Sequence, residues 1–225
     1  MTRARQLPIP LVHPSASGRD DFIVGSANAE ALATLDGFPD WPTPVTLLLG
    51  PAGSGKSHLA RIFAERAGAT IVGAGDVDAL DPLDLAARPL VVEDADGPGR
   101  DDVALFHLLN AVRERGGHLL LTARDDPPVW GIGLADLLSR LRAARPLRLG
   151  APDDELLARL LVKLFADRQI EVDRTVVDYL LPRIERSFAA ASALVEDLDQ
   201  GSLALGRKLT RPLAARLLGE SAQDY

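Results

Sequence analysis

The sequence predicts an α/β fold in which a parallel five-stranded sheet flanked by helices is followed by a small all-helical domain. Three observations lead to this expectation. Short apolar runs alternate with helical patterns from residue 45 to residue 149, which is typical of a parallel sheet covered on both faces. A glycine-rich loop follows the first apolar run. After Pro152, segments with helical spacing follow one another without a strand between them.

The first half of this α/β part begins with a helix. A short apolar segment and an amphipathic helix lie within residues 20–35. Residues 45–49 (VTLLL) are the first predicted strand, because they form a short apolar run that ends at a glycine loop. Residues 56–68 have helical spacing with Gly68 as the expected stop, and residues 70–75 predict a second strand.

The second half continues the alternation. Residues 89–96 are apolar until they meet two acids, which predicts a third strand. Asp101 and Asp102 are expected to cap a helix that runs to Gly116. A strand, a helix and a fifth strand are then predicted at residues 118–123, 134–144 and 146–149, and four helical segments at residues 153–168, 174–187, 188–206 and 210–219.

Composition limits the classes of function. The chain has 225 residues, of which 47% are hydrophobic, so it can bury a sizeable core. It contains no run of about eighteen apolar residues and no secretory signal, so we expect a cytoplasmic protein with no membrane contact. Cysteine is absent and the four histidines lack paired metal-ligand spacing, so we expect no structural metal.

Charge is distributed unevenly along the chain. The formal net charge of -7 argues against a protein that coats nucleic acid nonspecifically. Nine acids lie between Asp76 and Asp102, whereas a stretch from Arg140 to Arg148 has four arginines and no acid. Such asymmetry is often only solvated surface. It also suits face-to-face binding of a partner, or of a second copy of the chain in a homodimer.

A complete phosphate-loop (Walker A) motif, GxxxxGKS, lies between the first predicted strand and the helix after it. Its residues are Gly50, Pro51, Ala52, Gly53, Ser54, Gly55, Lys56 and Ser57, and His58 follows directly. Glycines let the backbone curl so that amide hydrogens point at phosphates, and the positive end of the helix adds to the attraction. Lys56 is expected to reach the β and γ phosphates, and the Ser57 hydroxyl to hold Mg²⁺. The motif therefore predicts a nucleotide site that includes His58.

Two acids end the third predicted strand at a Walker B-like position. Glu93 precedes Asp94 here, whereas NTPases that hydrolyse their nucleotide usually have Asp and then Glu. Glu93 as the Mg²⁺ ligand and Asp94 as the water-orienting group would each misplace their oxygens by one methylene, and catalysis suffers from errors of ~1 Å. We therefore expect nucleotide binding with weak intrinsic hydrolysis. The alternative is that both acids merely cap the strand.

The phosphate loop, the five-strand pattern and the helical C-terminal part together resemble AAA+ ATPases, and one segment narrows this to the bacterial replication initiator DnaA. Residues 22–28 are similar to the FxVGxxN segment that lies beside the adenine in the DnaA family. This resemblance implies nucleotide contacts for Phe22, Ile23, Val24 and Asn28. It covers nearly the whole chain, from about residue 19 to residue 218.

Two further segments resemble functional elements of the same family. Residues 138–141 (LSRL) are similar to its Ser-Arg element, which implies that Arg140 is an arginine finger. The strand end at Thr122 resembles the sensor 1 segment, although the residues between Thr122 and the following prolines do not align cleanly. DnaA continues into a helix-turn-helix domain, whereas this sequence ends at Tyr225, so we expect no direct sequence-specific DNA binding.

The N-terminal tail resembles a peptide of one branch of this family. Residues 6–11 (QLPIPL) are similar to the QLxLPL peptide by which Hda-type regulators dock on the DNA polymerase sliding clamp, with departures at the third and fourth positions. The prolines hold the chain extended, Leu7, Ile9 and Leu11 can fill an apolar groove, and the Gln6 amide can hydrogen-bond at its edge. The alternative is packing of the tail on the chain's own core.

The helical part departs from the family at one nucleotide contact. Residues 186–191 resemble the RSNVRE segment, in which an arginine called sensor 2 contacts the nucleotide, but Ala190 occupies that position. Arg183 or Arg186 is the alternative source of the contact. The missing arginine and the Glu93-Asp94 order together favour a nucleotide that acts as a structural ligand. The expected ligand is therefore ADP, or else ATP, with Mg²⁺.

The resemblance implies a clamp-binding tail (residues 1–14), an AAA+ base domain (15–151) and a helical lid domain (152–225). It implies a negative regulator of replication initiation that holds ADP, docks on the sliding clamp and presents Arg140 in trans to the ATP bound by DnaA. Such a protein has weak or no ATPase activity of its own. The alternatives are an ATP-hydrolysing loader or remodelling enzyme acting on nucleic-acid complexes, and a scaffold in which Arg140 is inert.

Overall fold

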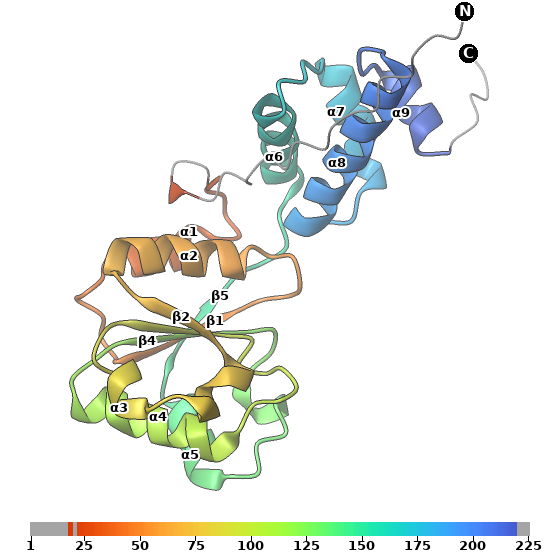
Figure 1. Cartoon of the computed structure of the whole chain (residues 1–225). Helices are drawn as coiled ribbons and strands as arrows, with labels where there is room; N and C mark the ends of the chain where they lie inside the picture. The colour runs from red at the N-terminus through yellow and green to blue at the C-terminus, as the bar shows by residue number, and fades with distance from the viewer. Residues whose placement is uncertain (1–17, 20–21, 220–225) are drawn as a thin grey trace, which may run out of the picture. The chain divides into compact units, whose positions relative to one another are not determined.

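The computed structural model describes residues 18–19 and 22–219, which divide into two compact units with the boundary in the chain between Pro152 and Asp153 (Figure 1). We call them the base unit and the helical unit. The expected clamp-binding tail, residues 1–14, lies outside the described residues. Among the described residues, no helix has the length and apolar character needed to cross a membrane.

The base unit alternates strands and helices as the sequence predicts. Its elements are α1 (Ala29–Asp36), β1 (Val45–Leu49), α2 (Lys56–Ala67), β2 (Thr70–Gly73), η2 (Ala74–Ala79), α3 (Pro82–Leu85), β3 (Leu90–Glu93), α4 (Asp102–Glu114), β4 (Leu119–Ala123), η3 (Pro127–Val129), α5 (Ala135–Arg142) and β5 (Arg145–Arg148). The strands form one parallel sheet in the order β2-β3-β4-β1-β5. This confirms the predicted fold class and its five strands.

Successive residues of the central strands β1, β3 and β4 pack into two different apolar cores, one on each face of the sheet. Leu48 of β1 packs with Leu59 and Phe63 of α2, whereas Leu47 and Leu49 pack on the side of α4 and α5. Figure 1 shows the same layers, with α1 and α2 on one face of the sheet and α3, α4 and α5 on the other. Each fully buried leucine contributes about 2 kcal/mol of transfer free energy, so both helix layers are firmly attached.

The register brings the loops that follow β1, β3 and β4 to one edge of the sheet. Leu49, the last residue of β1, pairs with Ala123 at the end of β4. Val92 near the end of β3 pairs with Leu121 of the same strand β4. Because all three strands are parallel, the segments that leave them start side by side. This carboxyl edge holds the candidate site.

Helix α4 begins differently from the sequence prediction. Asp101 is the N-cap and accepts hydrogen bonds from the amides of Val103 and Ala104, both at 2.8 Å. Asp102 is the first helical residue rather than a cap, and its carboxylate bonds elsewhere. Val103 is apolar and lies in the first turn, where its helical spacing suggests a place on the buried face, yet it is 56% exposed, because the face that meets the sheet is formed by neighbours such as Leu105.

The helical unit contains α6 (Asp154–Asp167), α7 (Arg174–Leu180), η4 (Leu181–Arg183), α8 (Phe188–Leu205) and α9 (Arg211–Leu217). Asp153 caps α6 by accepting from the Leu156 amide at 2.8 Å, and Ser187 caps α8 by accepting from the Ala190 amide at 3.1 Å. Residues 174–187 do not form the single predicted helix. Pro182 has no amide hydrogen to continue it, so the chain tightens into η4 and then leaves the helix.

Candidate nucleotide site

The phosphate loop runs from the end of β1 to the start of α2 at the carboxyl edge. Gly53 and Gly55 have φ angles of +70° and +92°, a region that other residues rarely adopt. A Cβ on Gly50 would lie 2.7 Å from the Leu149 carbonyl oxygen and 2.8 Å from the Ser54 hydroxyl oxygen. The loop therefore needs glycine at these positions, two for conformation and one for space.

Lys56 is held inside this loop. Its ammonium donates to the carbonyl oxygens of Gly50 at 2.7 Å and Pro51 at 2.9 Å, and the residue is only 8% exposed. An ammonium has three donors, so one remains for a phosphate oxygen. Burial lowers the pKa of Lys56 from its ordinary value, and the nearby carboxylates of Asp94 and Asp96 oppose that shift. Lys56 thus lies in electrostatic contact with the segment that follows β3.

The ends of β3 and β4 are joined through Thr122. Its hydroxyl oxygen accepts from the Asp94 amide at 3.0 Å, and its carbonyl oxygen accepts from the Ala95 amide at 2.8 Å. Asp94 has a φ of +53°, which is unusual for a residue with a side chain. The predicted sensor 1 residue therefore fixes the backbone of one of the two predicted Walker B-like acids.

Two charged residues that the sequence interpretation did not include lie beside these acids. Asp96 accepts from the Arg124 amide at 2.8 Å, and both residues, with Asp94, Gly97 and Pro98, line a hollow of about 310 Å³. A volume of this size suits part of a small ligand. The sequence signal was available, since Asp96 ends the predicted strand of residues 89–96 and Arg124 directly follows that of residues 118–123. It could not be used without knowing that β3 and β4 are neighbours.

The donors and acceptors present fit a nucleotide phosphate and Mg²⁺. The Ser54 hydroxyl oxygen and one carboxylate oxygen of Glu93 are buried and have no hydrogen-bond partner among the described residues. Buried polar atoms without a partner are unfavourable, so both are suited to a ligand. Lys56 would neutralise phosphate charge, while Ser57 and Glu93 would hold the cation, which supplies further charge neutralisation when bound.

The segment expected beside the adenine lies near the phosphate loop. The rings of Phe22 and His58 meet edge to face, with centroids 5.3 Å apart. The Asn28 side chain accepts from the Gly25 amide at 2.9 Å and donates to the Ile23 carbonyl at 3.0 Å. Both polar ends of this buried amide are therefore used to shape the segment. Asn28 positions its neighbours, whereas Val24 is partly exposed.

Arg140 does not join this site. It lies on α5, in the helix layer on the opposite face of the sheet from α2, and its guanidinium carbon is 4.9 Å from the centroid of the Phe106 ring. Stacking on an aromatic face restrains an arginine without consuming its hydrogen-bond donors. Arg140 and the helix that follows the phosphate loop, α2, thus lie on opposite faces of the sheet.

Both arginines considered as substitutes for sensor 2 have partners within the helical unit. Arg183 donates to the Tyr179 carbonyl at 3.0 Å, and its guanidinium carbon lies 4.0 Å from the Tyr179 ring centroid. Arg186 forms an exposed ion pair with Asp154 at 2.9 Å. Ala190 lies in the first turn of α8, where it carries the amide that Ser187 caps.

Comparison with known proteins finds one family match and several structures with the same fold. Residues 153–218 match the family described as "Hda, lid domain". The chain is similar in structure to domain III of the replication initiation protein DnaA from Thermotoga maritima, with a TM-score of 0.77, 16% identity, and 91% of this chain and 96% of that chain covered. It is also similar to AMPPCP-bound DnaA from Aquifex aeolicus, with a TM-score of 0.69, 19% identity, and 84% and 67% covered.

The same fold occurs in a motor protein. The RuvB Holliday junction branch migration motor of Thermotoga maritima matches with a TM-score of 0.70 and 15% identity, over 90% of this chain and 71% of that chain. At these identities the structural matches show the fold alone, and the family match covers residues 153–218. Together they agree with the fold that the resemblance implies. Residues 153–218 therefore match the Hda lid family, and the chain as a whole has the fold seen in domain III of DnaA.

Proposed function

We propose that this chain is a nucleotide-bound negative regulator of DnaA, which docks on the sliding clamp and accelerates hydrolysis of the ATP that DnaA holds. The observation that carries the proposal is an Hda-family lid joined to a base unit with the fold of DnaA in one chain. Because its base unit has the fold of DnaA, such a protein can pack against DnaA in the way that AAA+ subunits pack against one another. It would return DnaA to its ADP form and so suppress initiation.

The bound nucleotide in this proposal is ADP with Mg²⁺. Support comes from the phosphate-loop geometry, from the unpartnered oxygens of Ser54 and Glu93, and from the AMPPCP bound by the similar DnaA of Aquifex aeolicus. Weak hydrolysis is proposed because Glu93 and Asp94 stand in the reverse of the usual order. The left-handed backbone of Asp94 also limits how its short side chain can be aimed.

Arg140 is the proposed arginine finger for DnaA-bound ATP. It stacks on Phe106 in the layer away from its own phosphate loop, so the proposal needs it to act in trans. A guanidinium at the transferred phosphoryl group stabilises developing charge and is worth ~10³ to 10⁵ in rate where it has been removed. Residues 6–11 would supply clamp docking through an extended peptide with apolar anchors.

The Arg140 assignment is tested with two neighbouring arginines on one helix. Arg140→Ala should retain ADP and clamp binding yet lose nearly all stimulation of DnaA-bound ATP hydrolysis. Arg142→Ala, an exposed residue two positions along α5, is the matched control and should stimulate as wild type does. Equal stimulation by Arg140→Ala and wild type would show that another group serves as the finger.

The second candidate is an ATP-driven loader or remodelling enzyme, which the structural similarity to the RuvB motor favours. Both candidates use the phosphate loop, so that motif does not separate them. The separating measurement is the nucleotide carried by the purified protein and its rate of exchange and turnover. Tightly held ADP supports the regulator, whereas rapid ATP turnover, or turnover stimulated by nucleic acid, supports the motor.

A further inference from the structure

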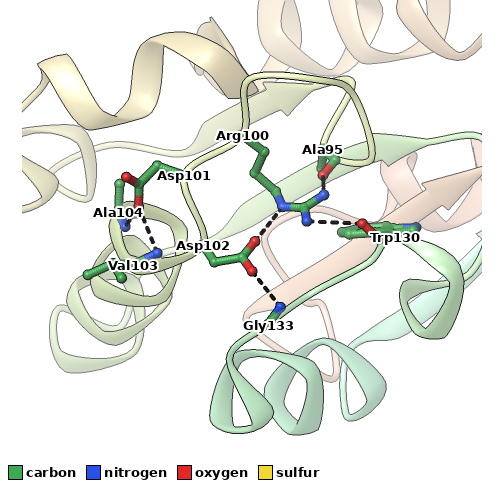
Figure 2. Close-up of polar contacts among 8 residues, drawn as sticks. All are labelled: Ala95, Arg100, Asp101, Asp102, Val103, Ala104, Trp130 and Gly133. Carbon is green, nitrogen blue, oxygen red and sulfur yellow. Dashed lines mark hydrogen bonds and ion pairs between the residues drawn. The ribbon is translucent and has the colours of Figure 1, made fainter.

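A buried arginine connects the candidate nucleotide site to the segment before α5. Arg100 lies in the loop between β3 and α4, and its side chain is 8% exposed. Its guanidinium donates to the Asp102 carboxylate at 2.8 Å, the Ala95 carbonyl at 3.0 Å and the Trp130 carbonyl at 3.2 Å (Figure 2). Each of its three nitrogens therefore has an acceptor, and the acceptors come from three different segments.

The carboxylate partner extends the connection towards α5. The second oxygen of Asp102 accepts from the Gly133 amide at 2.8 Å, two residues before α5 begins (Figure 2). The guanidinium carbon of Arg100 also lies 5.7 Å from the Trp130 ring centroid, and the indole nitrogen of Trp130 donates to the Asp125 carbonyl at 2.7 Å. The segment between β4 and α5 is thus tied to Arg100 and Asp102 at Trp130 and Gly133, and the Trp130 indole bonds back to Asp125 within the same segment.

The other end of the connection lies at the nucleotide site. Ala95, whose carbonyl oxygen accepts from Arg100, donates its own amide to the carbonyl oxygen of Thr122 at 2.8 Å. The neighbours of Ala95 in sequence are Asp94 and Asp96, the two carboxylates that act on Lys56. One continuous set of hydrogen bonds therefore runs from the strand ends beside Lys56 to Gly133, two residues before α5.

We propose that Arg100 is a positioning residue that fixes α5, and with it Arg140, relative to the nucleotide site. The inference rests on the proposed role of Arg140 and adds the residue that aims it. A buried ion pair gives little net stability, because desolvation offsets the attraction, but its directional bonds select one arrangement. A planar guanidinium can serve three acceptors at fixed angles, which an ammonium cannot.

The test uses Arg100→Gln, Asp102→Asn and the double variant, with Arg66→Gln as the matched control. Arg66 forms an ion pair of 2.6 Å with Asp36 in the same unit, but both side chains are substantially exposed, at 49% and 33%. Arg66→Gln therefore also removes one positive charge from an ion pair, but outside the hydrogen bonds of Arg100 and Asp102. ADP affinity is measured first, and all four variants should remain within about twofold of wild type, because none of the changed groups touches the phosphate loop.

Hydrogen exchange gives a result that does not depend on DnaA. In Arg100→Gln and Asp102→Asn, amides of residues 133–142 should exchange at least tenfold faster than in wild type, while α2 amides are unchanged. Maximal stimulation of DnaA-bound ATP hydrolysis should fall roughly ten- to a hundredfold, since a displacement of ~1 Å is enough for this. The concentration that gives half-maximal stimulation should stay the same. The double variant should be no worse than either single variant, because the two residues act as one pair.

Different failures are distinguishable. If wild type does not stimulate DnaA, the proposed function fails, while the exchange result still tests the connection. If wild type stimulates and Arg100→Gln has the same maximal rate and the same exchange of residues 133–142, the positioning role is wrong. Loss of ADP binding, or faster exchange throughout the base unit, would also overturn it, because Arg100 would then support the fold as a whole.

Discussion

In the proposed nucleotide site, single residues at the carboxyl edge would decide how phosphate is held. Lys56 is buried between two loop carbonyls and faces Asp94 and Asp96, so its positive charge is desolvated and partly balanced before any ligand arrives. A phosphate would replace lost hydration with a direct ionic contact. The sequence motif predicted Lys56 because its eight residues are contiguous. Asp96 and Arg124 were missed because only the pairing of β3 with β4 brings them together.

Nucleotide affinity should fall as pH rises into the alkaline range. Burial holds the pKa of Lys56 below 10.5, and a bound phosphate favours the charged ammonium and raises that pKa again. Binding therefore takes up protons between the pKa of the free protein and that of the complex, so affinity decreases across this interval. Titration of ADP from neutral pH to about 10.5 checks this. Affinity that is constant or rises with pH would contradict it.

The lowered pKa of Lys56 also makes the free energy of unfolding depend on pH. Because the pKa of Lys56 is lower in the folded than in the unfolded chain, the unfolded chain binds more protons between the lowered pKa and 10.5. The contribution of Lys56 to the free energy of unfolding therefore increases with pH across that interval. It is unfavourable and constant below it. Urea unfolding of wild type and Lys56→Met at several alkaline pH values measures this contribution by difference.

Gly50→Ala should weaken ADP binding at least about tenfold, which is a loss of about 1.4 kcal/mol. The new methyl group would meet the Leu149 carbonyl oxygen at 2.7 Å, and backbone atoms cannot move aside without distorting the loop. Gly75→Ala is the matched control, since its nearest neighbour would be 3.8 Å away and the affinity should not change. Equal ADP affinities for the two variants would show that the loop tolerates the displacement.

At the scale of elements, the order of the strands brings the loops after β1, β3 and β4 together at the candidate site. The apolar runs of β1, β3 and β4 could be predicted from the sequence because each is short, continuous and followed by a loop. Their order in the sheet could not, since it depends on contacts between residues far apart in the chain. The same limit applies to α4, where Val103 fits a helical apolar pattern but the helix turns a neighbouring face to the sheet.

The connection through Arg100 was also beyond the sequence. Asp102 was expected only as a helix cap and as one acid of an acidic stretch, and Trp130 and Gly133 lie about thirty residues further along the chain. Only the folded order of β3, α4 and β4 brings these groups within hydrogen-bond distance. Arg140, by contrast, was predicted from its local resemblance, yet its stacking on Phe106 needed the packing of α4 against α5.

Loss of the α4 cap should lower stability by a measurable amount. Asp101→Ala removes an acceptor for two amides at the start of α4 and should reduce the free energy of unfolding by about 1 kcal/mol. Asp101→Asn keeps a capping oxygen and should stay within a few tenths of a kcal/mol of wild type. Urea unfolding followed by tryptophan fluorescence reports on this unit, because Trp41 and Trp130 both belong to it. Equal stabilities for wild type and Asp101→Ala would contradict the capping role.

At the scale of the whole molecule, the proposal divides the work among parts. In this proposal the base unit holds nucleotide and carries Arg140, the helical unit contains the residues that match the Hda lid family, and residues 1–14 reach the clamp. The sequence predicted the two structural parts from the change of pattern near Pro152. The tail stays a prediction from six residues, because those residues are outside the described structure.

Deletion of residues 1–12 should abolish binding to the sliding clamp and leave ADP affinity unchanged, since the phosphate loop belongs to a separate part. Surface plasmon resonance on immobilised clamp measures the first property and ADP titration the second. A synthetic peptide of residues 1–14 should compete with the full chain, which a scrambled peptide should not. Undiminished clamp binding after the deletion would exclude the tail as the docking element.

The most direct measurement follows labelled ATP that has been loaded on DnaA. DnaA carrying radiolabelled ATP is mixed with clamp assembled on DNA and with this chain, previously loaded with unlabelled ADP, and conversion of the label is timed in a single turnover. The proposal predicts that conversion accelerates at least about a hundredfold and that acceleration requires Arg140, as expected for an arginine finger acting in trans. Label that persists on DnaA at its unstimulated rate would contradict the central claim.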